Sequence, residues 1–161
     1  MSATTPEIDT AMKNFTAIIL NGVPILLQQN ETVCLSFVCM VAAIDALAGY
    51  RYPGIVTSKR FQMFIEHYFP KNYGAHAPNL YILRCRLLHH FSPAHFTLTH
   101  AASPSHLTIS SIGDTILSAD AFFADLKAAA TNFFLEVEHD PVRQADMRKR
   151  LNDLSSGGAI Y

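Results

Sequence analysis

The sequence predicts a mainly α-helical bundle with a small β element. Apolar residues recur at helical spacing along most of the chain, 50% of its 161 residues are hydrophobic against 16% charged, and no repeat or low-complexity tract interrupts it. A chain of this length can bury a continuous core as one domain. We therefore expect residues 1–161 to form a single domain of five to six helices, with residues 155–161 as a short tail.

The N-terminal part of the chain predicts two helical regions that differ in their apolar pattern. Residues 6–29 carry one apolar stripe, and Pro24 bends or divides this helix because proline lacks a backbone N–H. Asn30 or Thr32 caps the next helix, which ends at Gly49. This second helix is apolar nearly all round, so we expect it at the centre of the bundle.

Turn and capping residues predict two more helices in the middle of the chain. A turn at residues 51–54 precedes a helix that Ser58 caps and Pro70 ends. The following helix begins near Pro78, because proline suits a first helical turn, and it ends before Ser92.

The period of the apolar pattern changes after this helix. Residues 96–100 and 106–110 are rich in threonine and alternate between polar and apolar side chains, which predicts a small β-hairpin near residues 96–110. Helical spacing returns after Ser118, and a shorter, more charged helix is expected from about residue 141 to residue 154.

The cysteines and the N-terminus indicate a reducing compartment. Cys34, Cys39 and Cys85 are odd in number and lack Cys-x-x-Cys spacing, so neither a disulfide framework nor a thiolate zinc site is expected. The first nine residues are polar and acidic, unlike a signal peptide. The apolar stretches 15–27 and 33–48 fall short of the roughly 20 residues that span a membrane. We expect a cytoplasmic protein with no membrane partner.

Positive charge is concentrated in the middle of the chain. Residues 46–113 hold six lysines and arginines against Glu66 as their single acid, and seven of the eight histidines. If these side chains share a face, they attract an anionic partner such as RNA. A solvated surface of mixed charge is the alternative.

Arg84 interrupts the apolar pattern of the helix near residues 78–91. Leu80, Leu83 and Leu87 have the spacing of a buried face, and Arg84 lies beside that face. A guanidinium near a core needs a carboxylate or phosphate to offset its lost hydration. Asp45, the single charge on the apolar central helix, is one candidate partner; alternatively, Asp45 lies near the helix end and reaches solvent.

The segment Leu-Tyr-Ile-Leu-Arg-Cys-Arg-Leu-Leu-His at residues 80–89 resembles the signature of the HEPN superfamily, in which four to six residues separate an arginine from a histidine near the end of a helix. The resemblance covers residues 33–91. It implies a small helical bundle that forms a homodimer. Many members are metal-independent endoribonucleases of toxin, defence or RNA-processing systems, which implies RNA and a neutralising protein as partners.

The resemblance implies roles for the two motif residues. Arg84 would contact the scissile phosphate and His89 would transfer the proton as the ribose 2′-hydroxyl attacks, with no metal or cofactor. A fixed cation beside a group that titrates near neutrality suits this chemistry. The sequence departs from active members at Cys85, where a polar residue is usual, and Arg86 and His90 are the candidates for the missing polar contact.

Basic residues outside the motif are candidates for RNA contacts: Arg51, Lys59, Arg60 and Lys71. The competing hypothesis is a noncatalytic interaction or scaffold protein in which Arg84 and Asp45 form a structural pair. Other site classes have weaker support, because the chain shows no helical His-x-x-x-His pair, no glycine-rich phosphate loop and no serine-nucleophile elbow.

Overall fold

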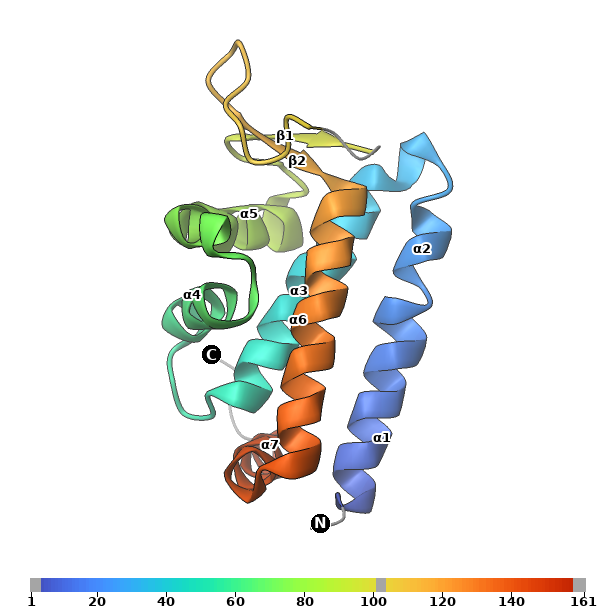
Figure 1. Cartoon of the computed structure of the whole chain (residues 1–161), viewed down its shortest axis with the longest axis vertical. Coiled ribbons are helices and arrows are strands. Elements are labelled where there is room, and N and C mark those ends of the chain that lie inside the picture. The colour runs from blue at the N-terminus through green and yellow to red at the C-terminus, as the bar shows by residue number, and fades with distance from the viewer. Residues whose placement is uncertain (1–3, 101–103, 158–161) are drawn as a thin grey trace.

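The computed structural model describes residues 4–100 and 104–157, and it shows a helical bundle with a small sheet at one end (Figure 1). The predicted mainly α class with a small β element is confirmed. In chain order the described elements are α1 (Pro6–Phe15), a π-helical turn (Thr16–Leu20), α2 (Val23–Leu26), a 3-10 turn (Asn30–Thr32), α3 (Val33–Arg51), α4 (Thr57–Tyr68), a 3-10 helix (Lys71–His76), α5 (Ala77–His90), β1 (Phe96–Thr99), β2 (Thr115–Ser118), α6 (Ala119–His139) and α7 (Pro141–Ser155).

Helix α3 lies at the centre of the bundle, as its apolar sequence predicts. Helices α2, α4, α5, α6 and α7 all contact it. Phe37, Met40, Ile44 and Leu47 on α3 are fully buried, which removes their apolar surface from water and supplies the main driving force for packing. The functional residues described below project from this helix and from the helices around it.

The N-terminal helical region is divided rather than simply kinked. Helix α1 continues into the π-helical turn, and α2 begins afterwards with Pro24 in its first turn. Gly22 stands at the junction, where a side chain would collide with the carbonyl group of Ile18. The division therefore depends on a close backbone approach at Gly22 as well as on the missing N–H of Pro24.

The predicted hairpin is wrong in its pairing. Strand β1 pairs with β2 in parallel, from Phe96 opposite Thr115 to Thr99 opposite Ser118. Residues 106–110 form turns and contribute an isolated antiparallel bridge between Ile109 and Thr115. Burial explains why β2, and not residues 106–110, pairs with β1, because β2 places Leu117 in the core. Residues 101–103, within the predicted loop, lie outside the described residues.

Side-chain caps define the starts of the last two helices. The Ser118 hydroxyl accepts a hydrogen bond from the Ala121 N–H at the start of α6. The Asp140 carboxylate accepts one from the Val142 N–H at 2.8 Å at the start of α7, and Pro141 occupies the first helical position. The Asp140 cap and Pro141 fix the corner between α6 and α7, which brings α7 across one end of α3 and beside α1 (Figure 1).

Within the described part of the chain, the segment Asn30–Arg51 is long and apolar enough to cross a membrane by length and composition. Half of its most apolar window is buried inside the bundle. The core helix of a soluble protein and a signal sequence meet the same criterion, so this feature alone does not assign α3 to a membrane.

Candidate functional site

Arg84 on α5 reaches Asp45 on α3 inside one subunit. Arg84 Nη2 donates a hydrogen bond to Asp45 Oδ2 at 2.5 Å, and both side chains are 17% exposed. Burial lowers the pKa of Arg84, but the hydrogen bond and the charge of Asp45 together outweigh it, so that the pKa is raised. The motif arginine is thus held in an ion pair.

Arg60 on α4 also faces Asp45. Its Nη2 lies 3.7 Å from Asp45 Oδ1, an ion pair too long for a hydrogen bond, and the residue is 6% exposed. Asp45 Oδ1, Arg60 Nε and Arg84 Nε are buried without a hydrogen-bond partner among the described residues. Two guanidinium groups therefore share one carboxylate, and their hydrogen-bonding capacity is only partly used.

Aromatic and sulfur groups surround the Arg84 guanidinium. Its Cζ lies 6.0 Å from the ring centroid of Tyr81, and the Tyr81 ring packs edge-on against Phe61. Arg84 Nη1 lies 4.0 Å from the Cys85 Sγ. Cys85 therefore offers Arg84 only a weak hydrogen-bond acceptor.

His89 lies apart from this ion pair. His89 and His90 are both exposed in the last turn of α5, where a partial negative charge favours them. Across the described residues, no hydrogen bond or ion pair joins His89 to Arg84. Within one subunit, the structure brings Arg84 to Asp45 and leaves His89 at the surface.

The other candidate residues are distributed over several faces. Arg86, like His90, is exposed, and Lys59 and Lys71 are exposed on α4 and on the 3-10 helix after it. Arg51 Nε donates to the Tyr68 hydroxyl at 2.9 Å, and Arg60 is buried. Arg51, Arg60 and Arg84 thus interact internally, which weakens the expectation of one basic face for an anionic polymer.

The sequence did not predict a series of hydrogen-bonded polar side chains between α4 and α6. The Tyr68 hydroxyl donates to Glu136 Oε2 at 2.7 Å while accepting from Arg51. Burial, followed by the hydrogen bond to Glu136, raises the pKa of Tyr68 far above its usual value. A cavity of about 530 Å³ lies beside these hydrogen bonds, and His67 and His139 are part of its lining. Helical spacing alone could not pair residues so distant in the sequence.

A second missed network anchors the segment between the strands. His106 Nδ1 accepts a hydrogen bond from the Ser118 N–H at 3.0 Å, so a neutral ring carries its proton on Nε2. That nitrogen contacts the Tyr73 hydroxyl at 2.7 Å, which donates to Asp125 Oδ2 at 2.7 Å. Burial lowers the pKa of His106, consistent with an uncharged ring.

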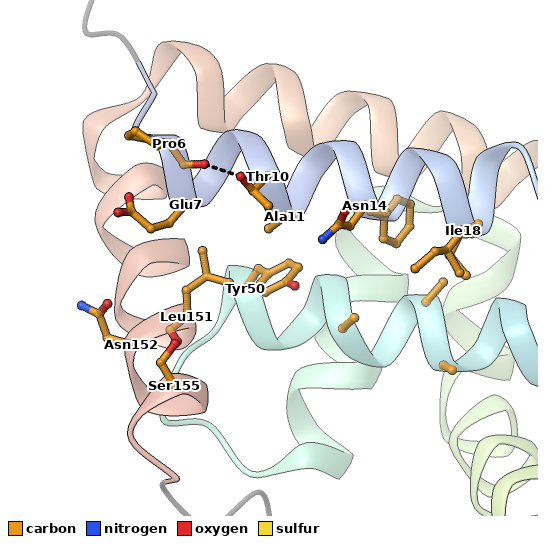
Figure 2. A pocket seen from close by; sticks show the side chains of 15 residues that line it. Pro6, Glu7, Thr10, Ala11, Asn14, Ile18, Tyr50, Leu151, Asn152 and Ser155 are labelled. Carbon is orange, nitrogen blue, oxygen red and sulfur yellow. Dashed lines mark hydrogen bonds between the residues drawn. The ribbon is translucent and has the colours of Figure 1, made fainter.

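A further cavity lies between α1 and α3, with α7 closing one end (Figure 2). It has a volume of about 670 Å³. A smaller cavity of about 220 Å³ adjoins it and contains Asp45, Arg60 and Arg150. The two cavities share Ala42, Ala46 and Tyr50. The sequence did not reveal this site because it depends on how three helices pack.

In the part of the chain that the structure describes, neither a metal-binding cluster nor a match to a known protein identifies a further functional residue. Among the described residues, no cluster of three or more histidine, cysteine, aspartate or glutamate side chains could hold a metal ion. No family model, curated protein or solved structure matches the chain. The proposal below therefore depends on the geometry of the molecule.

Proposed function

We propose that this chain is a noncatalytic, HEPN-like interaction protein in which Arg84 has a structural role. The observation that carries the proposal is the 2.5 Å hydrogen bond from Arg84 Nη2 to Asp45 Oδ2 within one subunit. A carboxylate at this distance offsets much of the charge of the guanidinium and fixes its orientation, so that a phosphate is attracted less strongly than by an unpaired arginine.

The energetic argument concerns the release of Arg84. A ribonuclease would have to turn this side chain toward the phosphate of its substrate and leave Asp45 with the longer contact to Arg60. Separating the partners of a buried ion pair costs about 3–5 kcal/mol, and the 17% exposure of both side chains here favours the lower end of that range. At about 1.4 kcal/mol per tenfold change, a cost of about 3 kcal/mol leaves the released state populated at somewhat less than one molecule in a hundred.

Phe91 supports an interaction role at the end of the motif helix. It follows His89 and His90 directly, is 76% exposed, and has a φ of 51°, in the left-handed region that glycine favours. An exposed aromatic ring in a conformation that costs energy suggests selection for contact with a partner. The partner that the resemblance implies is a second copy of the chain.

Cleavage of RNA in EDTA tests the proposal. Purified protein should leave a mixed-sequence RNA intact, as should the His89→Ala variant. Arg84→Ala should be less stable than the parent protein without a change in RNA integrity. Metal-independent cleavage that disappears in both variants, while Arg148→Ala at an exposed arginine of α7 retains it, would show instead that the motif is a ribonuclease site.

A further inference from the structure

The cavity between α1 and α3 has an apolar floor of small side chains. Ala42, Ala43 and Ala46 on α3 line it, and their short side chains leave space opposite α1. Ile18 on the α1 side also lines the cavity and is 68% exposed. Figure 2 shows side chains of α1 along one side of the cavity and Tyr50 and Leu151 across from them, toward α7. The alanines and Ile18 suit an aliphatic chain, and the polar part of the lining comes from Glu7, Thr10, Asn14, Asn152 and Ser155.

The adjoining smaller cavity has an excess of positive charge. Arg60 and Arg150 both line it, and Asp45 is the one carboxylate in its lining. Across residues 4–100 and 104–157, no carboxylate forms an ion pair with Arg150. Asp45 is already hydrogen-bonded to Arg84. The negative charge of Asp45 therefore lies among the guanidinium groups of Arg60, Arg84 and Arg150. The net charge of these four side chains is +2.

Arg60 provides the indication that this charge excess forms a binding site. It is 6% exposed, it lines the smaller cavity, and its Nε has no hydrogen-bond partner among the described residues. A buried donor without a partner is costly, and an anion in the cavity would satisfy it. Burial and the nearby charge of Arg150 both lower the pKa of Arg60, as expected where two cations lack a sufficient counter-charge.

Arg150 approaches the same place from α7. Gly49 on α3 is buried, and a side chain at that position would lie 3.1 Å from Arg150 Nε. Gly49 thus gives the guanidinium room to lie against the backbone of α3. Tyr50, the next residue, lines both cavities, so a ligand could contact the arginines and the apolar floor together.

We propose that the joined cavities bind a single-chain amphipathic anion, with its carboxylate or phosphate head group at Arg60 and Arg150 and its aliphatic chain between α1 and α3. Volumes of about 670 Å³ and about 220 Å³ suit a small molecule. The planar guanidinium fork matches either head group. This inference goes beyond the interaction role and does not depend on whether the Arg84 motif is catalytic.

Isothermal titration calorimetry with the full chain tests the proposal, using decanoate, decyl phosphate, decanol and inorganic phosphate below any micelle-forming concentration. At least one of the two amphipathic anions should bind at least tenfold more tightly than both decanol and inorganic phosphate. The tighter of the two identifies the preferred head group. Failure of both anions to bind, or equal binding of decanol or inorganic phosphate, would overturn the proposal.

Two variants locate the site. Arg150→Gln should weaken binding of the preferred anion about tenfold or more, because it removes a charged hydrogen-bond donor. Ala46→Phe should abolish binding, since Ala46 lines both cavities and is exposed enough to accept a ring without disturbing the core. Lys149→Gln, at an exposed cation on the same helix that lines neither cavity, is the matched control and should bind like the parent. Unchanged binding in both site variants would overturn the assignment, provided that their thermal unfolding matches that of the control.

Discussion

Asp45 holds two arginines in one polar cluster of the bundle. It stands on an otherwise apolar helix, and its carboxylate receives the short hydrogen bond of Arg84 and the longer ion pair of Arg60. Charges are rarely left unpaired in a protein interior. A change in any one of these three side chains therefore alters the pairing of the other two. The sequence could predict the ion pair between Asp45 and Arg84, because each is a charged residue on or beside an otherwise apolar helix face. It could not predict that the pair would exclude His89.

His106 should make the stability of the protein depend on pH. Its pKa is lowered in the folded state, so the unfolded chain, with an ordinary histidine pKa near 6.5, binds more protons at slightly acidic pH. The contribution of His106 is therefore fully present above about pH 6.5 and is lost as the pH falls through its folded-state pKa. Protonation at Nδ1 would also break the hydrogen bond from the Ser118 N–H.

Urea unfolding at pH 7.5 and pH 5.5 measures this effect. The parent should lose more unfolding free energy between these pH values than His106→Gln does. His95→Gln, at an exposed histidine before β1, should behave like the parent. Identical pH dependence in the parent and His106→Gln would contradict the role assigned to His106.

Phe91→Gly should make the fold more stable and self-association weaker. Glycine adopts the left-handed conformation without the cost of about 1 kcal/mol that a side chain incurs, and Phe91 is 76% exposed, so little burial is lost. Thermal unfolding and sedimentation equilibrium measure the two effects. Val142→Ser, at an apolar residue 57% exposed on α7, is the control and should not alter association. Unchanged association in Phe91→Gly would contradict the proposed contact.

At the scale of elements, the helices were predictable and the second strand was not. The starts of α3 and α7 follow from apolar periodicity and from local signals such as Pro141, whereas α3 continues through Gly49, its expected end, to Arg51. Strand β2 could not be distinguished from residues 106–110, because its pairing with β1 depends on burial of Leu117 rather than on a local pattern. The burial of Arg60 was readable in part, since Phe64 follows it at helical spacing.

Gly22 tests the division between α1 and α2. Gly22→Ala should destabilise the protein by more than about 1 kcal/mol, because its side chain would meet the Ile18 carbonyl, a backbone group that cannot move freely. Gly74→Ala is the matched control. No atom lies within 4 Å of a side chain added there, so this change should be neutral or stabilising by up to about 1 kcal/mol. Chemical denaturation compares the two, and equal effects would show that the division does not require Gly22.

At the scale of the whole molecule, α3, α4, α5 and α7 meet around one incompletely satisfied polar cluster. Asp45, Arg60, Arg84 and Arg150 come from these four helices, and most of the remaining interior is apolar. Buried polar groups need partners, and pairing between groups on different helices can help to fix the relative positions of those helices. The same cluster opens to the cavity in which we place an anion, so the structural pair and the binding site share Asp45.

A double-mutant cycle between Arg84 and Asp45 tests the structural role of the motif arginine most directly. Unfolding free energies would be measured for the parent, Arg84→Ala, Asp45→Ala and the double variant, with Arg86→Ala as a surface control expected to lie within about 0.5 kcal/mol of the parent. Each single variant should lose about 3 kcal/mol, and the double variant should lose at least about 1 kcal/mol less than the sum of the two. Additive losses, or an Arg84→Ala variant as stable as the control, would contradict the claim that Arg84 is held by Asp45.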